Sequence, residues 1–283
     1  MKGKLIIIGG AEDKGLPTDT SNGDDFTKNG ILKRIIEESA HKNQSRIEIV
    51  ATASKEPDEI GADYIKAFAK LNAKNTGILD ITTRPDASDA KILKRLEAAD
   101  VLFFTGGNQL RLTHLLGGSP FFESMLEKLK KEPFLYAGTS AGAAAVSEAM
   151  IIEGSSENAI LKGEIKTAAG FGLLPNIVFD THFMNRGRIG RLFQIILSNP
   201  EILGVGIEEN TGLMIANNKM EAIGPGMTIL LDGRTITGSN LLEIREGAPL
   251  SIQNLTLHVM SKTDVFDLKT RELHIITPPE CKI

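Results

Sequence analysis

Residues 138–142 have the sequence Gly-Thr-Ser-Ala-Gly, which places a serine between two closely spaced glycines. They follow an apolar run, 133–137, and precede an alanine-rich stretch, 143–150, that we expect to be helical. Gly-x-Ser-x-Gly between a strand and a helix is typical of a nucleophile elbow, a tight turn that leaves the hydroxyl of Ser140 at its tip. The same residues also occur where a turn packs a helix closely against a sheet, and the motif alone does not separate these interpretations.

A serine nucleophile needs a base that accepts its proton, and histidine is the usual base in such sites. His182 ends a predicted strand that begins at residue 177. Parallel sheets bind their ligands beyond the carboxyl ends of the strands, so we expect His182 to be the base. The other histidines lie in a polar stretch, a leucine-rich helical turn and the C-terminal strands: His41, His114, His258 and His274.

The acid that orients the base is expected at the end of the next strand, where Glu208 and Glu209 are adjacent. Successive side chains of a strand point to opposite faces, so only one of these glutamates can face His182, and the spacing does not say which. Asp180 is a rival acid because it shares a face with His182 if the strand stays regular. The order serine, histidine, acid differs from that of α/β-hydrolases, in which the acid precedes the histidine.

Soon after the predicted base, three arginines lie within six positions: Arg186, Arg188 and Arg191. They lie at the expected start of a helix, where positive charge is unfavourable. A solvated helix start with surface ion pairs is one interpretation of this pattern. The other is a balancing anion, which is either a protein carboxylate such as Asp180 or a substrate carboxylate held in bidentate fashion.

Another predicted strand ends in Thr-Gly-Gly-Asn-Gln, residues 105–109. Two glycines there allow the backbone to approach a ligand closely. The N–H of Gly107, together with that of Ala141, is a candidate oxyanion hole, and the amide of Gln109 is a candidate substrate contact. A simple turn with a glutamine cap explains the same residues equally well.

Glycines 9, 10 and 15 do not match the dinucleotide pattern G-x-G-x-x-G, and no P-loop G-K-[ST] occurs. We therefore expect neither an organic cofactor nor a metal.

The elements that must position these residues alternate between short apolar runs and amphipathic runs. The apolar runs are rich in branched residues and most lack in-out alternation, as in strands buried on both faces of a parallel sheet. The predicted strands are 5–8, 47–51, 78–81, 101–105, 134–137, 177–179 and 203–207, and the predicted helices are 31–38, 57–71, 90–98, 121–131 and 189–197. This alternation predicts an α/β fold, a three-layer αβα sandwich with a mostly parallel sheet.

The pattern changes after residue 209. Runs 212–223, 227–232 and 255–268 are typical of antiparallel strands joined by glycine-rich turns. No linker-like composition marks a boundary, so we expect a single domain over 1–283, with a core of about 1–210 and a C-terminal β extension over 211–283.

The composition narrows the class of protein. The 283 residues carry a formal charge of −4 without a long basic stretch, which argues against nucleic-acid binding. Cys281 is the single cysteine, so an internal disulfide is excluded, and we interpret it as a bystander. The first apolar run is shorter than a secretory core region, and no run approaches membrane-spanning length, so a cytoplasmic protein is expected.

With these residues identified, the chain resembles the cyanophycinases of serine peptidase family S51, which also contains aspartyl dipeptidases. The resemblance runs nearly end to end, and its most specific part is the arginine-rich block after the histidine. The segments that carry it are 9–13, 51–54, 104–109, 138–143, 182–191 and 206–211. It implies a fold like that of class I glutamine amidotransferases (flavodoxin-like), often as a homodimer, and a triad of Ser140, His182 and Glu209.

The resemblance also implies substrate contacts from Gln109, Asp180 and the three arginines. The substrate of that family is cyanophycin, a poly-aspartate backbone with arginine amide-linked to each β-carboxylate, and the products are β-Asp-Arg dipeptides. Thr181 stands where typical cyanophycinases have glutamine, which shortens one side chain of the expected substrate site. Two alternatives therefore remain: an aspartyl dipeptidase acting on short peptides, and a catalytically silent binding protein for an anionic metabolite.

Overall fold

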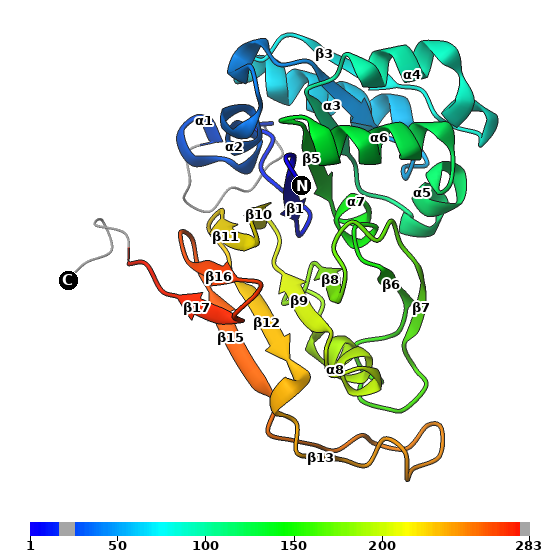
Figure 1. Ribbon diagram of the computed structural model, residues 1–283, viewed down its shortest axis with the longest axis vertical. Helices are drawn as coiled ribbons and strands as arrows, with labels where there is room; N and C mark the ends of the chain where they lie inside the picture. Colours follow the sequence, from blue (N-terminus) through cyan, green and yellow to red (C-terminus); the bar gives the residue numbers. More distant parts are fainter. Residues whose placement is uncertain (17–25, 278–283) are drawn as a thin grey trace.

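A computed structural model describes residues 1–16 and 26–277 of the chain, and Cys281 lies outside these ranges. Five parallel strands run side by side in the order β3-β2-β4-β5-β1 within a nine-stranded sheet (Figure 1). They are β1 (Lys4–Ile8), β2 (Ile47–Val50), β3 (Thr76–Leu79), β4 (Val101–Phe104) and β5 (Leu135–Thr139). Strands β2, β4 and β5 are buried along their whole length, which explains why their sequences lack alternation.

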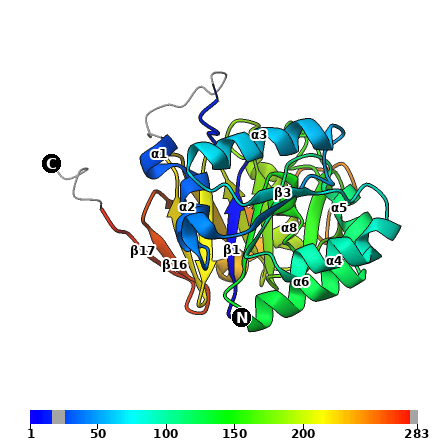
Figure 2. The same cartoon turned by 90° about the horizontal axis from the view of Figure 1, so that it is seen from above.

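Helices cover both faces of this parallel half of the sheet (Figure 2). One face packs on α2 (Ile31–Glu38) and α3 (Pro57–Lys70). The other face packs on α4 (Ala90–Glu97), α5 (Gln109–Leu116) and α6 (Pro120–Lys131). The remaining short helices here are α1 (Phe26–Asn29), η1 (Lys42–Gln44) and η2 (Pro85–Ser88). The predicted three-layer α/β arrangement is confirmed.

Four antiparallel strands extend the sheet from β1, and the first three of them lie within runs that the sequence predicted as antiparallel strands. They are β10 (Gly212–Ala216), β11 (Lys219–Ile223), β16 (Val265–Asp267) and β17 (Glu272–His274), in that spatial order. Strand β10 pairs directly with β1, so the C-terminal extension is continuous with the N-terminal strand.

Two strands that the sequence placed in the parallel sheet belong instead to a second, four-stranded sheet. Strands β8 (Ile177–Thr181) and β9 (Leu203–Ile207) are parallel to each other, and β9 continues through antiparallel β12 (Thr228–Asp232) and β15 (Thr256–Met260). One face of this sheet shares a hydrophobic core with the first sheet, and the other packs on α8 (Ile189–Ser198). Figure 1 shows this second sheet and α8 below the parallel half.

The expected helix over 143–150 is wrong. Helix α7 spans only Ala141–Ala144, and β6 (Ala149–Glu153) begins shortly after it. The side chain of Ser147 accepts a hydrogen bond from the N–H of Phe179 at 3.0 Å, which ties the segment to β8. The next residues pair with β7 (Lys166–Ala169), so tertiary pairing overrides the helical propensity of the alanines. The smallest elements are η3 (Gly233–Thr235), β13 (Gly238–Ser239) and β14 (Ile252–Gln253).

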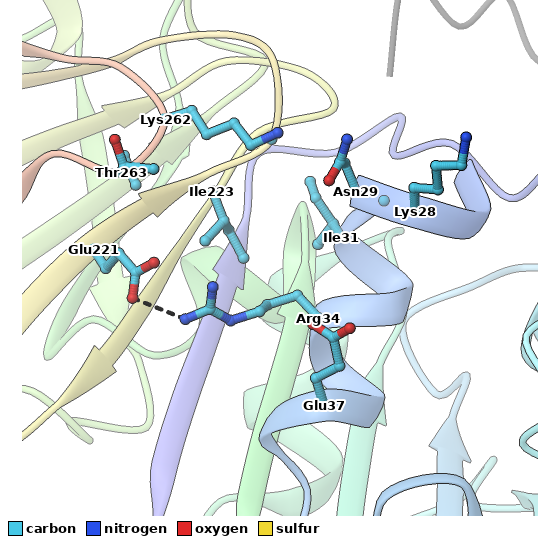
Figure 3. Close-up of a pocket in the computed structure, with 12 residues that line it drawn as sticks. Lys28, Asn29, Ile31, Arg34, Glu37, Glu221, Ile223, Lys262 and Thr263 are labelled. Atoms are coloured by element: carbon cyan, nitrogen blue, oxygen red, sulfur yellow. Dashed lines mark hydrogen bonds and ion pairs between the residues drawn. The ribbon is translucent and has the colours of Figure 1, made fainter. Parts of the chain in front are cut away.

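Charged side chains tie α2 to strands β1 and β11. Glu38 accepts from Lys4 at 2.6 Å and from Arg34 at 2.9 Å, and Arg34 also donates to Glu221 at 2.8 Å (Figure 3). Partial burial of Glu38 opposes its ionisation, but the hydrogen bonds from Lys4 and Arg34 hold the pKa of its carboxyl below the ordinary value. This cluster fastens the helix layer to the antiparallel half of the sheet.

No helix in the described ranges is long and apolar enough to span a bilayer.

Candidate active site

Ser140 lies between β5 and α7 with φ of +50° and ψ of −103°, a backbone conformation that residues other than glycine rarely adopt. Its N–H donates to the carbonyl of Ile8 at 3.0 Å, which anchors the turn to β1. A Cβ at Gly138 would lie 2.5 Å from the carbonyl oxygen of Gly142, and one at Gly142 would lie 2.6 Å from that of Phe104. The two glycines therefore permit the tight elbow that presents the serine side chain.

His182 directly follows β8 and also has a positive φ, +51°. Its N–H donates to the carbonyl of Gly9 at 2.8 Å, so the ends of β8 and β1 are joined at this residue. The imidazole packs over Gly10, where a Cβ would lie 2.4 Å from Cε1 of His182. In this position Nε2 of His182 is 3.0 Å from Oγ of Ser140, a hydrogen-bond distance.

Glu209 lies on the far side of the imidazole. Its Oε1 is 2.5 Å from Nδ1 of His182, and its Oε2 accepts a hydrogen bond from the amide of Asn185. Partial burial alone would raise the pKa of Glu209, but the hydrogen bonds from His182 and Asn185 bring it below the ordinary value. The carboxylate is therefore kept ionised beside the imidazole.

The other two acid candidates contact different groups. Glu208 accepts hydrogen bonds from the backbone N–H of Glu209 at 2.9 Å and of Met184 at 3.1 Å. Asp180 is buried and faces arginines, with Oδ1 3.3 Å from Nη1 of Arg188 and Oδ2 3.1 Å from Nε of Arg191. Among the three candidates, only Glu209 contacts the histidine in the described structure.

The arginines differ in their surroundings. Arg188 donates to the carbonyl of Thr181 at 2.7 Å in addition to its contact with Asp180, and Arg191 is only 6% exposed. Arg186 is exposed, and within the described part of the chain its guanidinium has no hydrogen-bond or ion-pair partner. Burial raises the pKa of Asp180 even though Arg191 and Arg188 oppose this effect. Asp180 is a single carboxylate beside Arg188 and Arg191, and its one negative charge cannot neutralise two positive charges.

A single pocket contains nearly all the residues that the sequence singled out. Ser140 and His182 line it together with both oxyanion-hole candidates, Gly107 and Ala141. In the described ranges neither of these two N–H groups has a hydrogen-bond acceptor. The remaining predicted residues that line the pocket are Gln109, Asp180, Thr181, Arg186, Arg188 and Arg191.

The side chain of Gln109 is already engaged, because its amide donates to the carbonyl of Ile151 at 2.8 Å. The cap of α5 is Asn108, whose side chain accepts from the N–H groups of Leu110 and Arg111, so the alternative of a glutamine cap is wrong. Thr181 is buried at the pocket wall.

Sequence reasoning assigned no role to Gly10, Glu12 and Asn185. The buried carboxylate of Glu12 accepts from the hydroxyl of Thr139 at 2.6 Å and from Tyr64, and so supports the residue before the nucleophile. The segment 9–13 was a signal only as part of the family resemblance, since its glycines fit no phosphate-binding pattern. No cluster of three or more His, Cys, Asp or Glu side chains in residues 1–16 and 26–277 is arranged to hold a metal ion.

Comparison with known proteins gives independent evidence for the family of this chain and for its fold. The model of peptidase family S51 matches residues 19–223. A cyanophycinase from Synechococcus elongatus is 34% identical over 281 residues, covering 98% of this chain and 84% of the relative. A cyanophycinase from Geminocystis herdmanii is 33% identical over 273 residues, covering 96% of each chain. The crystal structure of a peptidase from an acI-B1 actinobacterium superimposes with a TM-score of 0.61 at 19% identity, covering 92% of this chain and 96% of that one.

Proposed function

The chain belongs to peptidase family S51 and is a serine peptidase, and from that premise we propose that it degrades cyanophycin through Ser140, His182 and Glu209. The observation that carries the proposal is the continuous hydrogen-bonded path from Oγ of Ser140 through both ring nitrogens of His182 to the Glu209 carboxylate. This path joins the groups that a serine nucleophile needs.

In the first half-reaction Oγ of Ser140 attacks the carbonyl carbon of the scissile bond while its proton passes to Nε2 of His182. Glu209 stabilises the imidazolium that forms and holds Nδ1 protonated. The N–H groups of Ala141 and Gly107 donate hydrogen bonds to the former carbonyl oxygen and stabilise its negative charge. The imidazolium then gives its proton to the leaving nitrogen, the carbon–nitrogen bond breaks, and an ester with Ser140 remains.

In the second half-reaction water attacks this ester. His182 takes a proton from the water and returns it to Oγ of Ser140 as the carbon–oxygen bond to the serine breaks. The products are the released carboxylate and the free serine, so the enzyme returns to its starting protonation state.

Substrate choice follows from the charge of the pocket. Among the described residues, Asp180 is the one carboxylate that forms ion pairs with Arg188 and Arg191, and Arg186 is exposed at the same pocket. We expect the excess positive charge to hold free carboxylates of the substrate, which in cyanophycin are the α-carboxylates of the attached arginines. Thr181 is the position at which the substrate site differs from the typical family pattern, and it lines this pocket.

The proposal is tested by mass spectrometry of products after incubation with cyanophycin, with Asp-Xaa dipeptides as a parallel substrate. We expect β-Asp-Arg dipeptides from the polymer. Ser140→Ala should lower turnover by about three to six orders of magnitude with an unchanged circular dichroism spectrum. Cleavage of the dipeptides alone would instead indicate an aspartyl dipeptidase.

A fluorophosphonate probe separates an enzyme from a silent binding protein. Labelling of Ser140 is expected, and its absence in the folded protein would contradict a hydrolytic function. The family resemblance further predicts a homodimer in the cytoplasm, and light scattering after size-exclusion chromatography measures the oligomeric state.

A further inference from the structure

The turn after β8 carries a second group that contacts the proposed triad acid. Asn185 is three residues after His182, and its amide donates to Oε2 of Glu209. The other oxygen of the same carboxylate, Oε1, faces Nδ1 of His182 at 2.5 Å. The two side chains of one turn therefore hold the two oxygens of Glu209.

This turn is itself fixed by backbone hydrogen bonds. The N–H of Arg186 donates to the carbonyl of His182 at 3.1 Å, and the N–H of Arg188 donates to that of Phe183 at 2.9 Å. Glu208 then ties the turn to the end of β9, because its two oxygens accept from the N–H groups of Met184 and Glu209. Asn185 is thus presented to Glu209 from a turn whose position is set on both sides.

A carboxylate held by one hydrogen bond can still rotate about its last side-chain torsion, which has broad minima. A second donor on the opposite oxygen restricts that rotation and favours the ionised form. Resting on the triad proposed above, we infer that Asn185 is a positioning residue that aligns the Glu209 carboxylate with the imidazole of His182. It acts through Glu209 and contacts neither the pocket nor the nucleophile in the described structure.

The charged groups around Glu209 determine how the reactivity of Ser140 should depend on pH. His182 and Arg186 exert favourable electrostatic effects on the carboxylate, and Glu208 contacts its backbone N–H. Replacing the Asn185 amide by a carboxylate would put a second negative charge at Oε2. That charge would repel the Glu209 carboxylate, raise the pKa of its carboxyl and weaken its contact with the imidazole.

The experiment measures the second-order rate constant for fluorophosphonate labelling of Ser140 as a function of pH. We expect Asn185→Ala to lower the rate constant about tenfold and Asn185→Asp about a hundredfold, a tenfold change being about 1.4 kcal/mol in the barrier. The acid limb of the profile should move to higher pH, most in Asn185→Asp. Asn185→Gln, which keeps the amide donor, should remain within about threefold of the wild type.

Met184→Ala is the matched control, since Met184 is the exposed neighbour on the same turn and, within residues 1–16 and 26–277, its side chain makes no polar contact. Wild-type rates and an unchanged pH profile in Asn185→Ala would overturn the inference, as would an equal loss in Met184→Ala. Absence of labelling in the wild-type protein would instead contradict the triad itself, so the two failures are distinguishable.

Discussion

At the scale of single residues, the adjacent carboxylates of Glu208 and Glu209 face different partners. Glu209 contacts the imidazole of His182, whereas Glu208 binds two backbone N–H groups. We expect Glu209→Gln to lower kcat by about three to four orders of magnitude, because a neutral amide cannot stabilise the imidazolium and can hold the wrong tautomer. Glu208→Gln keeps one acceptor oxygen and should cost about tenfold or less. Steady-state kinetics on both variants checks this, and equal losses would contradict the assignment.

We expect substitution of Gly10 to lower the activity strongly, although this residue carries no functional group. Its φ is +102°, and an added Cβ would lie 2.4 Å from Cε1 of His182. We therefore expect Gly10→Ala to displace the imidazole and lower kcat by about a hundredfold or more. Gly118→Ala is the control, since Gly118 also has positive φ but has nothing within 4 Å of the added atom. Fluorophosphonate labelling rates and melting temperatures of both variants measure the difference, and equal labelling rates would refute it.

Motif and spacing identified the nucleophile and base candidates but left the acid open, and only the family resemblance pointed to Glu209. Strand β9 ends at Ile207, so Glu208 and Glu209 both lie beyond the ladder, and the alternation rule no longer applies to them. The role of Gly10 was hidden for a different reason. Its contact with His182 joins residues that are far apart in the chain, at the meeting of β1 and β8.

At the scale of elements, the sequence predicted most strands but not how they divide between sheets. Strands β5 and β8 are both short and fully buried, yet they lie in different sheets. The apolar composition of a strand predicts that it is buried. It does not predict which strand pairs with it, and that pairing decides the sheet to which it belongs. The helix expected over 143–150 failed for the same reason, since pairing of β6 with β7 outweighs local propensity.

The charged side chains that tie α2 to β1 and β11 give a prediction about pH and stability. The folded-state pKa of Glu38 is lowered, so its ion pairs with Lys4 and Arg34 stabilise the fold above the ordinary carboxyl pKa of 4.5. That contribution should disappear as pH falls through the lower folded-state value. We expect Glu38→Gln to reduce the free energy of unfolding at neutral pH by about 1–2 kcal/mol and to flatten its decrease below about pH 4.5. Urea titrations at several pH values test this, and parallel pH profiles for the two proteins would contradict it.

At the scale of the whole molecule, the site lies where the two sheets meet. Ser140 follows a strand of the first sheet, and His182 and Glu209 follow strands of the second. The backbone of Gly9 links them, since its N–H donates to Thr211 and its carbonyl accepts from His182. The distance between nucleophile and base therefore depends on the packing of one sheet against the other.

This shared packing leads us to propose that 1–283 forms a single folding unit, including the β extension after residue 210. Leu230 of β12 is fully buried in the core that both sheets share. We expect Leu230→Ala to destabilise the protein by about 2–5 kcal/mol and to shift one cooperative transition as a whole. Leu257→Ala is the control, because Leu257 pairs with β12 from β15 but is 48% exposed. Calorimetry should give equal calorimetric and van't Hoff enthalpies for the wild type, and labelling of Ser140 should vanish in the same transition. Two separate transitions, with only one moved by Leu230→Ala, would show that the extension folds independently of the catalytic core.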